Sequence, residues 1–136
     1  MSTENLNELE QLMPKALLVE DNPENSDVMM HFLKKMCRVD LANDAPTAIE
    51  KSRAEQYDII LMDINLGLGM NGMEATKIIR GISGYEKIPI VAVTAYAMAG
   101  DKEIFLEAGC SHYISKPFTK REFVGLIERI LAEHTV

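Results

Sequence analysis

Five residues that can do chemistry each stand at or just after the end of a short apolar run. Glu20 and Asp21 follow the first run, Asp63 the third, Thr94 the fourth and Lys116 the fifth. Three carboxylates in one pocket repel each other, and Mg²⁺ relieves this because it is a hard cation that takes oxygen ligands. An ammonium and a hydroxyl suit phosphoryl oxygens better than Mg²⁺. Together these residues predict a site for a phosphoryl group on or near a carboxylate.

The elements that must bring these residues together alternate regularly along the chain. Short apolar strands are predicted at Ala16–Val19, Arg38–Ala42, Ile59–Met62, Ile90–Val93 and His112–Ile114. Helical spacing of apolar residues lies between and after them: Pro23 to about Met36, Pro46 to about Gln56, Gly72–Arg80, Asp101–Ala108 and Thr119 to about Leu131. Within these helices we expect Val28 and Ile78 to face inward.

This alternation predicts an α/β fold with a parallel sheet that is covered by helices on both faces. Right-handed crossovers place the carboxyl end of every strand at one edge of the sheet. Ligands of open α/β sheets bind at that edge. Asp21, Asp63, Thr94 and Lys116, which are successively 42, 31 and 22 positions apart in sequence, should therefore meet in space.

Length, charge and cysteine content exclude several classes of protein. The chain has 136 residues, which suits one domain, and we expect a polar N-terminal extension over residues 1–14 and the domain over 15–136. A net charge of −7 disfavours nucleic acid and anionic membranes as partners. Cys37 and Cys110 lack metal-site spacing and fit reduced, buried thiols. With no export signal at the start, these features predict a cytoplasmic protein.

Each of the chemical residues has an ordinary structural explanation when it is considered alone. An acidic pair before Asn22–Pro23 can belong to a helix start, and a lysine before a proline can belong to a surface turn. A hydroxyl at the end of a strand, such as that of Thr94, is also an ordinary structural feature. The argument for function rests on the whole set, in which each member occupies a matching strand end.

The segments LLVEDNPEN, DIILMDINL, IPIVAVTAYA and GCSHYISKPF, in this order and spacing, resemble the receiver domain of two-component response regulators. The resemblance runs from about Lys15 to Ala132 and is nearest to single-domain or hybrid-kinase receivers. It implies a flavodoxin-like, doubly wound fold with five parallel strands in the order 2-1-3-4-5.

The resemblance also implies a magnesium site and a phosphoacceptor. Asp63 would be the phosphoacceptor. Asp21 would bind Mg²⁺ directly and Glu20 through water, and Asn65 would contribute its backbone carbonyl.

The same resemblance implies the groups that hold and sense the phosphoryl group. Thr94, the backbone N–H of Ala95 and Lys116 would bind its oxygens, and the bond between Lys116 and Pro117 would be cis. Thr94 would then move, and Tyr113 would turn inward as the switch aromatic.

The implied function is a phosphorelay switch rather than an enzyme. The phosphoryl group would come from a phosphohistidine on a sensor histidine kinase or a histidine phosphotransfer protein. Output would be a changed surface on the helix 101–108, the strand 112–114 and the last helix, which would bind a downstream protein. We expect a monomer or weak dimer.

The loop after Asp63 departs from the common receiver pattern, and so does Glu20, which stands where aspartate is commoner. The loop Ile64–Gly72 has no proline and is about one residue longer than usual, with extra glycines that should make it more mobile. Tyr96 lies two residues after Thr94, and we expect its ring to hinder the hydrolytic water and prolong the phosphorylated state.

Three alternatives remain at this point. A haloacid-dehalogenase-like aspartyl-phosphate hydrolase would need a second Asp where Asn65 stands. A flavodoxin-like nucleotide carrier would place its phosphate against Glu20 and Asp21, which would repel it. A receiver that has lost phosphorylation and acts as a scaffold is disfavoured by the complete residue set.

Overall fold

The computed structural model describes residue 8 and residues 11–67, 69–95 and 100–134. Its strands are β1 (Lys15–Val19), β2 (Arg38–Ala42), β3 (Ile59–Asp63), β4 (Ile90–Thr94) and β5 (His112–Ser115). Its helices are α2 (Pro23–Leu33), α3 (Ala45–Ala54), α4 (Gly72–Arg80), α5 (Asp101–Ala108) and α6 (Lys120–His134). All strand pairs are parallel, in the order β2-β1-β3-β4-β5. The predicted fold and strand order are confirmed.

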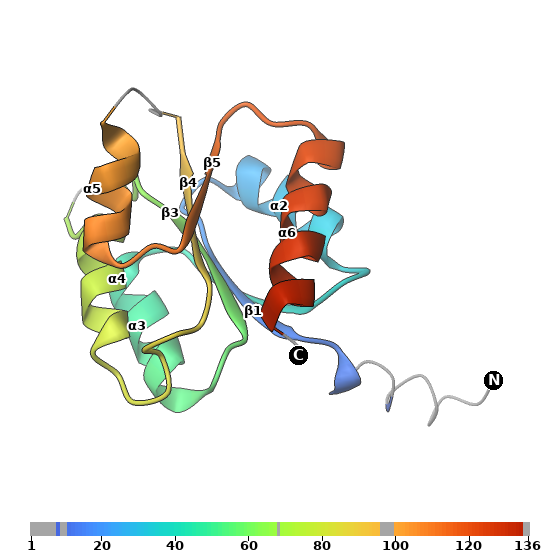
Figure 1. Cartoon of the computed structure of the whole chain (residues 1–136), viewed down its shortest axis with the longest axis horizontal. Coiled ribbons are helices and arrows are strands. Elements are labelled where there is room, and N and C mark those ends of the chain that lie inside the picture. Colours follow the sequence, from blue (N-terminus) through green and yellow to red (C-terminus); the bar gives the residue numbers. More distant parts are fainter. Residues whose placement is uncertain (1–7, 9–10, 68, 96–99, 135–136) are drawn as a thin grey trace.

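The helices form two layers on the sheet. Figure 1 shows α3, α4 and α5 on one face and α2 and α6 on the other. Each layer has its own apolar core, one built around Ile49, Ile79 and Phe105 and the other around Leu33 and Phe123. β1, β3 and β4 lie between the layers and are apolar on both faces, as expected for a covered parallel sheet.

The strand register brings the chemical residues to one edge. Val19 pairs with Met62, so Glu20 and Asp21 follow β1 at the level where β3 reaches Asp63. Asp63 pairs with Val93 and Thr94 pairs with Ser115, one residue before Lys116. The register therefore sets the four strand ends side by side, as the alternation of strands and helices predicts.

Local hydrogen bonds begin and end the helices that flank the site. The Asn25 N–H donates to Asn22 Oδ1 at 3.0 Å, which caps α2 directly after the acidic pair. The Glu122 N–H donates to Thr119 Oγ1 at 3.1 Å, so the predicted cap of α6 is confirmed. Gly109 closes α5 with a φ of 110°, a conformation that favours glycine.

The structure differs from the predicted helices at three places. α2 ends at Leu33 rather than Met36, because the N–H groups of Met36 and Cys37 both donate to the Leu33 carbonyl in a tight turn. The side chains of Val28 and Ile78 are 50% and 38% exposed instead of inward-facing. Both lie at the edge of the apolar stripe, where hydrophobic spacing alone does not separate core from surface.

Gly72 joins the start of α4 to the strand that carries Asp63. A Cβ at this position would lie 2.2 Å from the Asp63 carbonyl oxygen, and the Gly72 N–H donates to the Ile64 carbonyl at 3.1 Å. Nothing lies within 4 Å of a Cβ added at Gly125, in α6. The two glycines therefore form a matched pair for testing how closely α4 must approach the site.

We expect Gly72→Ala to lower the free energy of unfolding by roughly 1–3 kcal/mol, because the added methyl overpacks backbone that cannot rotate away. Gly125→Ala should leave stability unchanged or raise it by up to about 1 kcal/mol, since glycine is unfavourable within a helix. Urea unfolding measures both. Equal effects of the two substitutions would show that α4 does not approach Asp63 this closely.

Candidate functional site

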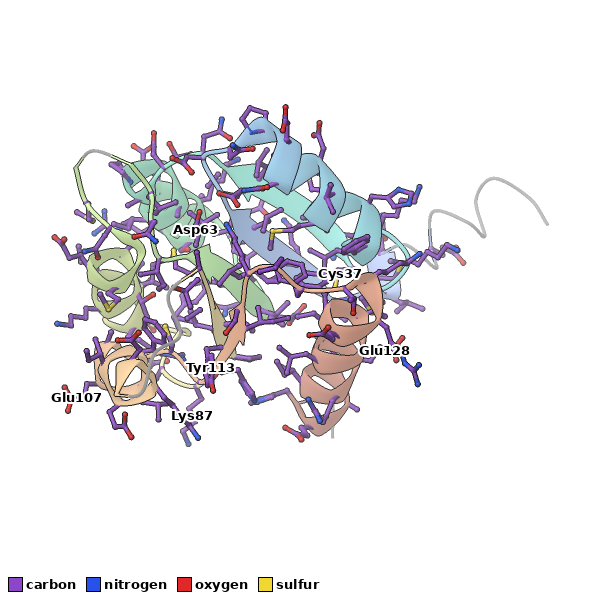
Figure 2. All side chains as sticks on the ribbon, turned by 90° about the horizontal axis from the view of Figure 1, so that it is seen from above. Cys37, Asp63, Lys87, Glu107, Tyr113 and Glu128 are labelled. Carbon is purple, nitrogen blue, oxygen red and sulfur yellow. The ribbon has the colours of Figure 1, made fainter. Side chains whose placement is uncertain are left out.

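The site lies at the carboxyl ends of β1, β3, β4 and β5. Figure 2, seen from above, shows Asp63 between the two helical layers. Carboxylate oxygens of Glu20, Asp21 and Asp63 all lie within 4.8 Å of one another. Glu20 and Asp63 are only 1% and 5% exposed, whereas Asp21 is exposed. The sequence prediction that these three carboxylates converge is confirmed by the geometry.

Lys116 bridges the two buried acids. Its ammonium donates to Glu20 Oε1 at 2.9 Å and lies 3.6 Å from Asp63 Oδ2. The Asn22 N–H also donates to Glu20 Oε2 at 3.4 Å. Asp63 Oδ1 accepts the Asn65 N–H at 3.0 Å. Both buried carboxylates thus have donors, which burial of charge requires.

Burial and the interactions among Glu20, Asp63 and Lys116 together set the pKa values of this cluster. Burial raises the pKa of Asp63 to about 7, the adjacent Glu20 carboxyl adds to the rise, and Lys116 and the Asn65 N–H oppose it. For Glu20, burial also acts to raise the pKa, but interactions with Asp63 and Lys116 outweigh it and the pKa falls. Burial acts to lower the pKa of Lys116, but Glu20 and Asp63 outweigh it and the pKa rises. One ammonium is therefore shared by two acids that cannot both ionise freely.

The cluster suits a divalent cation. Its donors are all carboxylate oxygens, as Mg²⁺ prefers, and the exposure of Asp21 leaves room for water in the coordination shell. A cation here would also relieve the repulsion that raises the pKa of Asp63. The residues present therefore fit the predicted magnesium site.

The predicted phosphoryl-binding residues lie on the neighbouring strand ends. Thr94 is buried at the end of β4, and its carbonyl accepts the Lys116 N–H at 2.7 Å. Ala95 follows in an exposed bend. The Lys116–Pro117 bond is cis, as predicted. The roles of the Thr94 hydroxyl, the Ala95 N–H and the Asn65 carbonyl in binding stay predictions.

The predicted switch residue is separate from this cluster. Figure 2 shows Tyr113 well apart from Asp63, and its ring centroid lies 6.3 Å from that of Phe105 in α5. The Tyr113 side chain is partly exposed. Tyr96 lies outside the described residues, so its predicted effect on hydrolysis stays a prediction.

Sequence reasoning missed two features of the site. It placed Lys116 only against phosphoryl oxygens, whereas the structure pairs it with Glu20. It also missed the close approach of Gly67 to Asp21. A Cβ added at Gly67, whose φ is 71°, would lie 3.2 Å from Asp21 Oδ2. The first could have been found from charge, because three predicted carboxylates share one predicted ammonium. The second depends on loop geometry that sequence spacing does not define.

Comparison with known proteins identifies the family of the chain. The family model of the response regulator receiver domain matches residues 16–128. The chain is a member of the response regulator receiver family. The haloacid-dehalogenase-like alternative is not supported.

Among receivers in longer proteins, the chain is 40% identical over 119 residues to hybrid signal transduction histidine kinase G of Dictyostelium discoideum. That match covers 85% of the chain and 3% of the kinase, so the chain spans only a small part of this relative. It is also 34% identical over 123 residues to the polar-differentiation response regulator DivK of Brucella anthropi, covering 89% of the chain and 99% of DivK.

A solved receiver resembles the structure closely. The receiver domain of the sensor histidine kinase PA1611 from Pseudomonas aeruginosa is 37% identical, with a TM-score of 0.80, over 88% of this chain and 98% of that one. In that crystal structure a magnesium ion is coordinated in the active-site cleft. Among the described residues of the present receiver, no helix is long and apolar enough to cross a bilayer.

We expect Asp63→Asn to stabilise the receiver in Mg²⁺-free buffer at pH 8. The pKa of Asp63 is about 7 in the fold, well above the value of about 3.9 in an unfolded chain. Wild-type stability should therefore fall as the pH rises from about 4 to 7, and the amide removes this loss. The gain should be roughly 1–3 kcal/mol, since one pKa unit corresponds to about 1.4 kcal/mol.

Urea unfolding at pH 5 and pH 8 with a chelator measures the effect, which should shrink at pH 5. Asp27→Asn is the control, because Asp27 is an exposed residue of α2. If Asp63→Asn instead lowers the free energy of unfolding by the same amount at both pH values, repulsion between Asp63 and Glu20 is contradicted.

Proposed function

We propose that this receiver takes a phosphoryl group from a phosphohistidine onto Asp63 and acts as a switch, not as an enzyme with turnover. The main support is the bridging position of Lys116, 2.9 Å from Glu20 and 3.6 Å from Asp63, inside a cluster of three acids. A buried carboxylate beside an ammonium and potential cation ligands can carry an incoming phosphoryl group whose charge is neutralised on arrival.

In the transfer, a carboxylate oxygen of Asp63 forms a bond to phosphorus while the bond between phosphorus and the imidazole nitrogen breaks. The electron pair leaves with the imidazole, and an aspartyl phosphate remains. Asp63 must be ionised to attack, so any proton that its raised pKa retains must leave the carboxyl before the transfer. Lys116 favours that ionised state, and the Asn65 N–H holds one carboxylate oxygen in place.

Mg²⁺ would be held by Asp21 and Asp63 directly, by Glu20 through water and by the Asn65 carbonyl. When bound, it supplies charge neutralisation for the attacking carboxylate and the phosphoryl oxygens. The protein's own residues would bind the phosphoryl oxygens. Lys116 is close enough to Asp63 to bind one phosphoryl oxygen, and Thr94 and the Ala95 N–H at the end of β4 would bind others.

The changed surface would be the face of α5, β5 and α6. Ile104 and Leu106 in α5 and Tyr113 in β5 are large apolar side chains that are partly exposed. Movement of Thr94 toward the phosphoryl group would let Tyr113 turn inward and change this face for a downstream protein. Apolar side chains at a surface suit recognition by a partner that covers them.

The family supports the choice of upstream partner, a sensor histidine kinase or a histidine phosphotransfer protein. We place the receiver domain at residues 15–136, with residues 1–14 as an extension, and expect a monomer or weak dimer. A cytoplasmic site of action fits two buried thiols among the described residues. The net charge of −7 continues to argue against nucleic acid or membrane as the target.

We expect incubation with acetyl phosphate and Mg²⁺ to add one phosphoryl group, about 80 Da, to the intact chain. Asp63→Asn should abolish the adduct and Asp27→Asn should not. Intact-mass spectrometry after short incubation measures it. Repeated turnover of small phosphomonoesters, or an adduct that persists in Asp63→Asn, would contradict the proposal.

We expect Lys116→Met and Asp21→Asn to separate phosphoryl binding from metal binding. Asp21→Asn removes a metal ligand and should weaken Mg²⁺ binding by at least about tenfold, since close charge contacts are each worth one or more kcal/mol. Lys116→Met removes a competing cation, so Mg²⁺ should bind as well as before or more tightly, while phosphorylation at saturating Mg²⁺ becomes much slower. Calorimetry and intact mass measure the two properties. Loss of both Mg²⁺ binding and phosphorylation in Lys116→Met would contradict this separation of roles.

A further inference from the structure

A groove between α2 and α6 gathers positive charge on the surface of an acidic protein. We call it the basic groove and define it by Phe32, Lys34, Lys35, Lys120, Arg121 and Val124. Its main hollow has a volume of about 280 Å³ and continues into a neighbouring hollow along α6. Glu128, which borders both hollows, lies far from Asp63 in Figure 2, so the groove is separate from the phosphorylation site.

The charge in the groove is not neutralised by the receiver itself. Lys34, Lys35, Lys120 and Arg121 are exposed, and among the described residues that line the two hollows Glu128 is the one carboxylate. Within the described part of the chain, none of the four cations lies within 4.0 Å of a carboxylate. Because the whole chain carries −7, this cluster opposes the sign of the remaining surface. Such a local reversal of charge favours an anionic partner at this place.

The floor of the groove is apolar and already ordered. The Phe32 ring lies 5.8 Å from that of buried Phe123, and Phe118 stacks on Phe123 at 5.0 Å. Val124 is partly buried beside them. A preformed apolar floor with cations at its rim can accept an aliphatic side chain while the rim pairs with carboxylates.

We propose that the basic groove binds an acidic segment of a partner protein, one that presents an aliphatic side chain between glutamates or aspartates. An acidic protein segment fits better than a nucleic acid or an anionic membrane, because the rest of the surface is acidic and repels an extended polyanion. The apolar side chains of the floor also make no favourable contact with a phosphate backbone. The groove shares no residue with the Asp63 cluster, so this binding is independent of the proposed phosphorylation.

The experiment uses the full chain, labelled with ¹⁵N, and a helical peptide of about 15 residues, or about four turns, made of Glu, Ala and Leu. A second peptide carries Lys in place of every Glu. We expect the acidic peptide to shift the amide signals of Phe32, Lys34, Lys35, Lys120 and Val124. Its affinity should fall roughly tenfold when salt is raised, because exposed charge pairs are screened. The Lys peptide should not bind.

Charge reversal tests the assignment of the site. Lys34→Glu/Lys35→Glu should weaken binding of the acidic peptide by at least about tenfold. Lys77→Glu/Lys87→Glu makes the same change in net charge at exposed positions outside the groove and should change affinity less than about twofold. Val124→Thr, which keeps the shape but adds a hydroxyl to the floor, should weaken binding a few-fold. Circular dichroism confirms that each variant is folded.

Asp63→Asn should bind the peptide as tightly as wild type, so failure here and failure of the phosphorylation proposal can be told apart. Equal loss in the two double-lysine variants, or amide shifts away from the groove, would overturn the inference. Tighter binding of a short DNA duplex or of vesicles containing phosphatidylserine through the same residues would overturn it as well.

Discussion

The pairing of Lys116 with two buried carboxylates is the interaction on which the site depends. Burial raises the pKa of Asp63 to about 7 and the adjacent Glu20 carboxyl adds to the rise, because the one ammonium that opposes it is shared by both acids. An isolated stable domain would gain by replacing one acid with an apolar residue. A divalent cation held by the three carboxylates would offset the repulsion between these acids, so the resting site holds an electrostatic conflict that the proposed Mg²⁺ would relieve.

Such a conflict can persist only where the surrounding backbone is held firmly. β1, β3 and β4 are buried on both faces, and their register leaves the ends of the strands no freedom to separate the charges. Gly72 adds to this constraint, because α4 begins against the Asp63 carbonyl with no space for a side chain. The apolar sheet therefore supplies the stability that the polar edge lacks.

The fold and most of the site could be predicted because both depend on periodic features. Apolar runs identify strands, parallel crossovers align their ends, and the residues after Val19, Met62, Val93 and Ile114 must then converge. The pairing of Lys116 with Glu20 does not follow from this periodicity, although the ratio of three carboxylates to one ammonium indicates that Lys116 has an acidic partner. Exposure of Val28 was missed because hydrophobic spacing does not show how wide a stripe the neighbouring helix covers.

Because the chemistry lies on strand ends, the outer surfaces of the helices are free to serve other contacts. The exposed apolar side chains of Ile104, Leu106 and Tyr113 lie on α5 and β5, whereas the basic groove runs between α2 and α6 in the opposite layer (Figure 1). The two surfaces differ in chemistry as well as place, one apolar and one cationic. A partner recognised by charge therefore need not compete with one recognised by apolar contact. The proposed switch surface includes α6, but neither Thr94 nor Tyr113 lines the basic groove, so we expect the groove to hold a partner in either state of Asp63.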